Sequence, residues 1–165
     1  MLRGDIYIDG EKKGSNIALN EVTVTREGTM HMMQMKTYVN DTLLNVCRAD
    51  GMIIATPTGS TGYSLSAGGP IIAPQAALFV MTPLAAHTLN TRSVGRPERD
   101  RIAVEIGPGR DDTTEHAVVY FDGASSVQIE TSDRVEIRRA EHSARIIRIN
   151  QDSFMDTLRR KMSAI

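Results

Sequence analysis

The sequence predicts a mainly β fold, a two-layer, sandwich-like domain of about ten strands. Most apolar residues alternate with polar ones in short runs. Turn-forming residues separate these runs, and the 165-residue chain contains 13 Gly and 6 Pro. Only two stretches show helical spacing. Short alternating strands joined by frequent turns are typical of antiparallel β proteins.

The first strands follow from period-2 alternation. Isoleucines alternate with polar residues over 6–8, up to the Asp9-Gly10 turn, and valines alternate with threonines over 22–25. Residues 31–48 read as a hairpin, because an apolar alternation is interrupted at Asn40-Asp41 and then resumes. An Asn-Asp pair between two such runs favours a turn.

The later strands are of two kinds. Residues 52–55 and 76–82 are short apolar runs, as expected for buried strands. The remaining alternating runs are 102–106, 118–121, 127–129, 135–137 and 145–149.

Two helices are expected. Residues 60–67 form a short one that stops at Gly68-Gly69. Residues 153–163 form a clearer one with apolar residues at helical spacing, and either Ser153 or Asp152 is a suitable N-cap. We treat residues 1–165 as a single domain.

Composition excludes several classes of function. The 19 Lys and Arg nearly balance 20 Asp and Glu, giving a net charge of -1, so nucleic acid or membrane partners held by bulk charge are not expected. Aromatic residues are 4% of the chain and Trp is absent, which argues against a base-stacking surface. Cys47 is the only cysteine, which excludes a disulfide framework and favours a cytoplasmic location. The histidines lack metal-ligand spacing, so no metal site is assigned.

The most informative segment is residues 50–70, DGMIIATPTGSTGYSLSAGGP. It reads as strand, turn, helix start and glycine stop. Residues 56–62 contain four hydroxyl side chains and two glycines, so backbone N–H groups and hydroxyls can converge there on a polar ligand. It is not a P-loop, because the lysine is absent. From the residues alone, an ordinary strand-to-helix turn with a Ser/Thr cap remains an equal interpretation.

The order of this segment resembles the signature of the NAD kinase family, TPTGSTAY followed by SxSAGGP. Here Gly62 stands where the family usually has alanine. Residues 18–21 (ALNE), 76–87 (AALFVMTPLAAH) and 121–123 (FDG) resemble further family segments, in the family's order. The resemblance extends over nearly the whole chain and is to the family's C-terminal lobe.

The resemblance implies a function. NAD kinases transfer the terminal phosphoryl group of ATP, or of polyphosphate, to the 2′-hydroxyl of the adenosine ribose of NAD, giving NADP. They use Mg²⁺ or another divalent cation. In the family, the β-rich C-terminal lobe supplies most NAD contacts and a homo-oligomer interface, for a dimer or a tetramer. An N-terminal α/β lobe carries a GGDGT motif whose Asp is the general base.

The resemblance also assigns roles near the adenosine half of the ligand. Asn20 would bond the adenine and nearby ribose, and Glu21 would accept from ribose hydroxyls. Thr61 and Ser66 would contact adenine or phosphate beside Gly62. Tyr63 would stack on or line the cleft. A polar loop pair at Asn20-Glu21 and a core-filling Tyr63 are the corresponding structural alternatives.

Further candidates lie toward the nicotinamide half. Asp50 would meet that end, within one subunit or across a subunit boundary, and Ala85 and His87 match positions around the same pocket. A turn aspartate and a structural histidine are the alternatives for Asp50 and His87. Additional candidates are Arg48, Thr58 and Asp122, of which Asp122 either holds its own loop or touches ligand.

One departure from the family matters. The chain contains no Gly-Gly-Asp sequence, and Gly68-Gly69 is followed by Pro70. We therefore expect this chain to bind NAD or NADP without a catalytic residue of its own, and to lack the N-terminal lobe. The alternatives are a stand-alone nucleotide-binding module, a member of the related lipid kinases, and a purely structural β domain.

Overall fold

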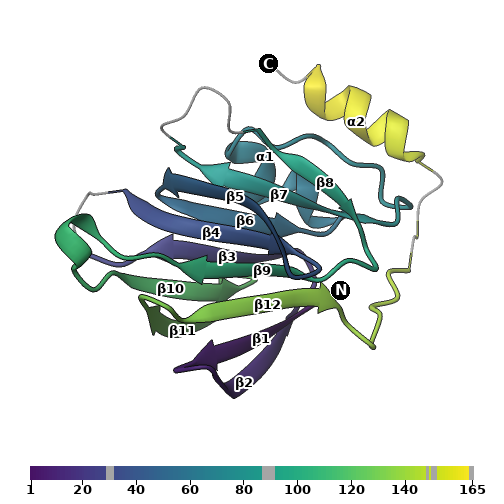
Figure 1. Cartoon of the computed structure of the whole chain (residues 1–165). Coiled ribbons are helices and arrows are strands. Elements are labelled where there is room, and N and C mark those ends of the chain that lie inside the picture. The colour runs from purple at the N-terminus through teal and green to yellow at the C-terminus, as the bar shows by residue number, and fades with distance from the viewer. Residues whose placement is uncertain (29–31, 87–91, 148, 150–151, 164–165) are drawn as a thin grey trace.

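A computed structural model describes residues 1–28, 32–86, 92–147, 149 and 152–163. Two six-stranded sheets, antiparallel at every pairing, pack face to face (Figure 1). Sheet A has the order β2 (Glu11–Ala18), β1 (Leu2–Ile8), β12 (Arg134–Arg139), β9 (Ile102–Ile106), β4 (Met33–Val39) and β5 (Thr42–Ala49). Sheet B has the order β11 (Ser125–Glu130), β10 (His116–Phe121), β3 (Glu21–Arg26), β6 (Gly51–Ala55), β7 (Leu78–Leu84) and β8 (Val94–Pro97). The mainly β, two-layer prediction is confirmed, with twelve strands rather than about ten.

The core lies between the two sheets and follows from alternation. On β4, residues 33, 35, 37 and 39 are buried while the residues between them are partly exposed. Phe121 on β10 reaches across the core to β1, where a Cβ on Gly4 would lie 2.7 Å from the Phe121 ring. The chain therefore needs a residue without a side chain at Gly4, because protein interiors leave no room for such an overlap.

Two strands were missed by the sequence analysis and one expected strand is wrong. Residues 11–17 of β2 are all exposed, so they show no apolar alternation, and β8 lies in a polar segment. Residues 145–147 and 149 are not in a strand, and the side chains of Ile147 and Ile149 are 85% and 97% exposed. Their apolar spacing suits a strand, but no strand in the described part of the chain pairs with them.

Both expected helices are present, with altered limits. The first is the four-residue α1 (Tyr63–Ser66), preceded by a 3₁₀ turn at Gly59–Thr61. The second is α2 (Phe154–Met162), and its N-cap is Ser153, whose hydroxyl accepts from the Asp156 N–H at 3.1 Å. The Asp156 carboxylate in turn accepts from the Ser153 N–H at 3.1 Å, which completes a capping box. No helix in the described part of the chain is long and apolar enough to cross a membrane.

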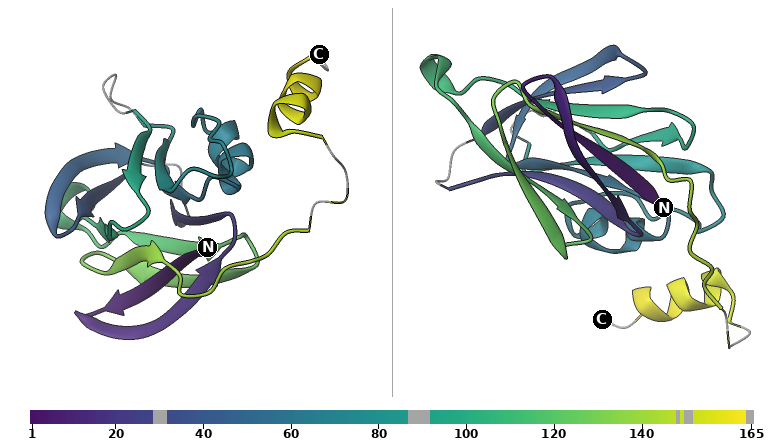
Figure 2. Two further views of the ribbon diagram at one scale, coloured as in Figure 1. Left: turned by 90° about the vertical axis from the view of Figure 1, so that its right-hand side faces the viewer. Right: turned by 90° about the horizontal axis from the view of Figure 1, so that it is seen from below.

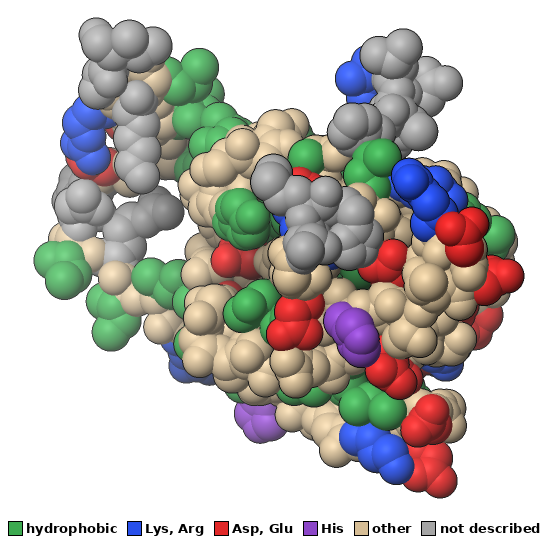
Figure 3. All heavy atoms as spheres, turned by 90° about the vertical axis from the view of Figure 1, so that its left-hand side faces the viewer, with side chains coloured by type: hydrophobic (Ala, Val, Ile, Leu, Met, Phe, Trp, Pro, Cys, Tyr) green, Lys and Arg blue, Asp and Glu red, His purple; other side chains and the backbone are tan. Residues whose placement is uncertain are grey.

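The C-terminal segment stands apart from the sandwich. Figures 1 and 2 show α2 at the end of an extended arm in all three views. On the face in Figure 3, Lys and Arg side chains lie among Asp and Glu side chains without a broad patch of either sign. This mixture agrees with the net charge of -1. The element that positions the candidate site is α1, which contacts β6 of sheet B.

Candidate functional site

The loop after β6 is tied to the turn before β3 by one threonine. The Thr56 N–H donates to the Asn20 carbonyl at 2.8 Å, and the Thr56 hydroxyl donates to the Leu19 carbonyl at 2.9 Å. The same hydroxyl accepts from the Gly59 N–H at 3.0 Å. Two segments that are far apart in the sequence are thus held together where the ALNE and TPTGST motifs end.

Gly59 allows this contact to be close. A Cβ at this position would lie 2.1 Å from the Asn20 carbonyl oxygen. Real side chains do not approach a backbone oxygen so closely, so the loop backbone packs directly on the backbone of Asn20. A glycine at position 59 therefore allows the ALNE and TPTGST motifs to pack against each other.

The four hydroxyl residues of the turn divide into two pairs. Thr56 and Ser60 point inward and hold the loop, because the Ser60 hydroxyl donates to the Pro57 carbonyl at 2.7 Å and accepts from the Ile72 N–H at 3.0 Å. Thr58 and Thr61 are exposed, and the Thr61 hydroxyl donates to the Thr58 carbonyl at 3.3 Å. Only the second pair is free to meet a ligand.

Asp122 holds the turn that presents Asn20 and Glu21. Its carboxylate accepts from the N–H groups of Leu19, Asn20 and Glu21 at 2.6, 2.8 and 3.0 Å. Of the two roles considered for Asp122, this geometry accounts for the loop-holding one. Three charge-assisted bonds from consecutive N–H groups fix the backbone from which the Asn20 and Glu21 side chains project.

Glu21 is left with an unsatisfied carboxylate. Its Oε2 is buried and has no hydrogen-bond partner within the described residues. Burial, together with the nearby charge of Asp122, raises the pKa of the Glu21 carboxyl above its usual value. Gly62 lies beside this carboxylate, because a Cβ at Gly62 would be 3.6 Å from Oε2.

A pocket of about 480 Å³ gathers four of the expected site residues, Asp50, Tyr63, Ser66 and Ala85. Tyr63 is 48% exposed and is therefore not core filler. The pocket is completed by Thr25, Arg26, Ala67 and Leu84, which the sequence analysis missed. Thr25 and Arg26 follow the ALNE motif on β3, but their place beside Asp50 depends on the pairing of β3 with β6, so no local signal in the sequence would have found them.

Asp50 is placed by the start of β6. Its N–H donates to the Leu84 carbonyl at 2.9 Å, and its side chain pairs with the Arg26 Nε at 3.0 Å. The next residue must be glycine, because a Cβ on Gly51 would lie 2.3 Å from the Val24 carbonyl oxygen. Asp50 thus lies at a bend before β6 and also lines the pocket.

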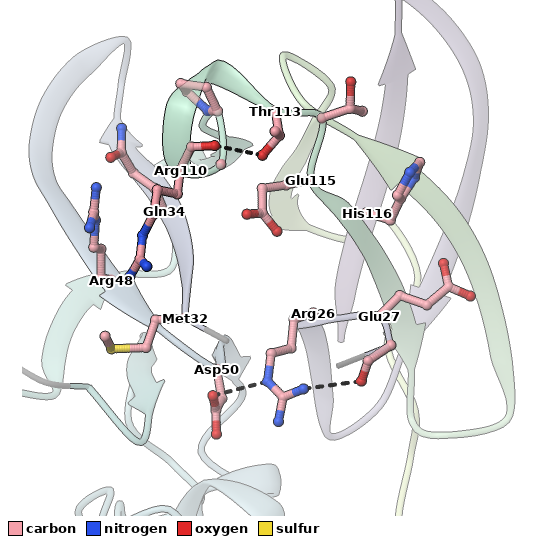
Figure 4. Close-up of a pocket in the computed structure, with 14 residues that line it drawn as sticks. Arg26, Glu27, Met32, Gln34, Arg48, Asp50, Arg110, Thr113, Glu115 and His116 are labelled. Carbon is pink, nitrogen blue, oxygen red and sulfur yellow. Dashed lines mark hydrogen bonds and ion pairs between the residues drawn. The ribbon is translucent and has the colours of Figure 1, made fainter. Parts of the chain in front are cut away.

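Arg48 faces a different and larger pocket of about 940 Å³, shown in Figure 4. Arg26 and Asp50 line both pockets, so their ion pair lies where the two meet. His87 falls outside the described residues. Helix α1 is a single turn without a side-chain cap, so it adds little dipole to the site.

A family described as the ATP-NAD kinase C-terminal domain matches residues 19–149. The chain belongs to the NAD kinase family. It is 40% identical to an NAD kinase of Agathobacter rectalis over 98% of this chain and 58% of that protein. It is also 40% identical to an NAD kinase of Flavobacterium psychrophilum, over 92% of this chain and 50% of that protein.

Solved structures agree with this membership. Yeast NADH kinase complexed with NADH has a TM-score of 0.75 at 28% identity, over 83% of this chain and 39% of that one. An NAD kinase from Archaeoglobus fulgidus in complex with ATP has a TM-score of 0.68 at 27% identity, over 86% of this chain and 51% of that one. The chain spans 58% and 50% of the length of the two bacterial NAD kinases named above. The expected family and fold class are both confirmed.

Proposed function

We propose that this chain is the NAD(P)-binding lobe of an NAD kinase. In the complete enzyme, ATP would phosphorylate the 2′-hydroxyl of the adenosine ribose of NAD. The observation that carries the proposal is Glu21, whose buried carboxylate oxygen lacks a hydrogen bond beside the TPTGST turn. An unsatisfied buried acceptor is costly in the free protein, and a ribose hydroxyl is a donor that would relieve it.

The proposed ligand runs along sheet B with its two ends at the two ends of β3. Asn20, Glu21 and Thr61 would contact the adenosine half, where Asp122 fixes the turn. Tyr63 and Ser66 lie on α1 between the two ends, and Asp50 and Ala85 line the far pocket. His87 remains a candidate for that end. Thr58 and Arg48 are the remaining candidate contacts.

Phosphoryl transfer needs a base and a metal site in addition to the residues that would bind NAD. The ribose 2′-oxygen must attack the terminal phosphorus, ADP must leave, and the hydroxyl proton must pass to a base. The 165 residues contain no Gly-Gly-Asp sequence to supply that base. The described residues include no group of three or more His, Cys, Asp or Glu side chains placed to hold a metal, so no Mg²⁺ site is assigned to them. We propose that the chain binds NAD(P) but does not catalyse transfer by itself.

We further propose a cytoplasmic homo-oligomer, either a dimer or a tetramer. The edge strand β5 supports this, because Leu43, Leu44 and Val46 on it are 50%, 47% and 47% exposed. Unpaired strand edges with apolar side chains favour association with another copy. The mass in solution, measured by light scattering, tests the proposal, and a monomer at micromolar concentration would contradict it.

The second candidate is a stand-alone, non-catalytic nucleotide-binding module. The same pocket supports it, because binding needs only Asn20, Glu21, Asp50 and Tyr63 in place. The two candidates differ in whether a partner lobe completes the enzyme. Supplying the chain with ATP, Mg²⁺ and such a lobe yields NADP under the first and no NADP under the second.

Thermal unfolding of the purified chain with NAD or NADP tests binding. Stabilisation should follow mass action, about 2.7 kcal/mol at a ligand concentration 100 times Kd. Asn20→Ala and Glu21→Ala should each abolish the shift, because each removes a direct ligand contact. Asn45→Ala, on exposed β5, is the matched control and should keep it. No shift in the wild type at millimolar ligand would refute autonomous binding.

A further inference from the structure

We propose that Arg26 is a positioning residue that holds Asp50 in place for the nicotinamide end of the ligand. The inference rests on the proposed function and extends it to a residue with no assigned role. Arg26 is the last residue of β3 and Asp50 immediately precedes β6, its neighbour in sheet B. The pair therefore forms at one edge of the site, where strands β3 and β6 meet.

Arg26 donates two hydrogen bonds to Asp50, one from its main chain and one from its side chain. Its main-chain N–H donates to the Asp50 carbonyl at 3.1 Å, and its Nε donates to Asp50 Oδ1 at 3.0 Å. Its Nη1 donates to the Gly28 carbonyl at 3.3 Å, which ties the guanidinium to the chain on the other side (Figure 4). A guanidinium that donates to separate acceptors on two sides has a fixed direction, which a flexible ammonium cannot match.

The Asp50 side chain is more exposed than that of Arg26. The Arg26 side chain is 17% exposed, whereas that of Asp50 is 42% exposed. The Arg26 side chain is thus the more shielded of the two, although it also lines the pocket. Asp50 Oδ1 is occupied by Arg26, while Oδ2 has no hydrogen-bond partner within the described residues. One acceptor of an oriented carboxylate remains available in the pocket with Tyr63, Ser66 and Ala85.

The position of the pair along the sheet assigns it to one end of the ligand. Arg26 is five positions after Glu21 on β3, a span of about 17 Å in an extended strand. Helix α1 follows the same direction, since Gly62 lies beside Glu21 and Ser66 lines the pocket with Asp50. A mononucleotide held at Asn20 and Glu21 is too short to reach Asp50, whereas a dinucleotide has a second end that does so.

This role differs from that of a structural ion pair. Lys36 and Glu105 form a comparable pair on sheet A at 2.9 Å, between β4 and β9 and away from the pocket. Removing the cation of either pair removes one positive charge and the ion pair described here. Only the loss of Arg26 should release a ligand-binding side chain.

Calorimetric titration of the 165-residue chain with NAD and with AMP tests the inference. Arg26→Met should raise the Kd for NAD about tenfold and leave the Kd for AMP within about twofold, because only NAD reaches Asp50. Arg26→Lys should fall between, since one ammonium cannot serve both Asp50 and Gly28. The double variant Arg26→Met/Asp50→Asn should bind NAD no more weakly than Asp50→Asn alone. Lys36→Met should leave both affinities unchanged.

Three results would overturn the inference. If Arg26→Met lowers the melting temperature but leaves the Kd for NAD unchanged, Arg26 is only a structural clamp. If it weakens NAD and AMP equally, its effect is general disruption of the site. If the wild type binds neither ligand, the proposed function fails, and this inference fails with it.

Discussion

A single glycine sets how closely the two ligand-binding motifs approach each other. Gly59 lies against the backbone of Asn20, and Thr56 bonds both Asn20 and Gly59. The turn that presents Asn20 is held from the opposite side by Asp122. The positions of the polar side chains are therefore fixed by backbone packing and by residues that need not touch ligand.

Gly59→Ala should destabilise the chain by about 2–3 kcal/mol and abolish the NAD-induced shift, because the new Cβ would lie 2.1 Å from the Asn20 oxygen. Chemical denaturation measures the first effect and thermal unfolding with NAD the second. Gly14→Ala is the control, since its Cβ would meet nothing within 4 Å, and its stability should change by less than about 0.5 kcal/mol. Equal behaviour of the two variants would show that the close approach is not needed.

At this scale the sequence predicts residues within motifs better than residues outside them. Glu21, Tyr63 and Asp50 were identified because they lie in or beside segments that resemble a known signature. Arg26 was not, because its partner Asp50 is 24 positions away and their contact depends on the register of β3 against β6. No local spacing encodes such a contact.

The elements differ in how much they depend on the core. Strand β4 alternates strictly and was predicted, whereas β2 is exposed along residues 11–17 and owes its strand to pairing with β1. The sequence from 145 to 149 shows the reverse case, because its apolar pattern has no partner strand among the described residues. A period-2 pattern thus indicates that one face of a segment is buried. It fails to predict a strand that is paired but exposed, and it wrongly predicts a strand where an apolar segment has no pairing partner.

The C-terminal arm is the clearest test of this distinction. The side chains of Ile146 and Ile147 are 71% and 85% exposed, and α2 stands away from both sheets (Figure 2). Truncation after Ala140 should therefore change the free energy of unfolding by less than about 0.5 kcal/mol. The bond from the Ala140 N–H to the Met1 carbonyl would be kept. Denaturation of the truncated and full chains measures this, and a loss of several kcal/mol would show that the arm packs on the sandwich.

For the whole molecule, pH acts through two carboxylates with opposite effects. Asp5 on β1 is 4% exposed and contacts Arg3, Lys12 and Arg138 on three adjacent strands. Burial alone would raise its pKa, but the bonds from Lys12 and Arg3 hold the pKa of Asp5 below its usual value. Glu21 has the opposite shift, because burial and the Asp122 charge raise its pKa.

The signs follow from linkage between protonation and folding. Asp5 contributes stability above the ordinary aspartate value, about pH 4, and this is lost as pH falls through its lowered folded pKa. Asp5→Asn should therefore cost about 1–3 kcal/mol at pH 7, and the difference from wild type should shrink in acid. Glu21 instead destabilises the fold progressively as pH rises from the ordinary glutamate value through its raised folded pKa. Glu21→Gln should therefore be more stable than wild type at pH 7 and similar to it near pH 3. Unfolding measured from pH 3 to pH 7 checks both. The stability of the two variants at pH 7 should deviate from wild type in opposite directions. If both deviate in the same direction, ionisation of Glu21 does not destabilise the fold. The site then lacks the unsatisfied acceptor on which the proposed ribose recognition depends.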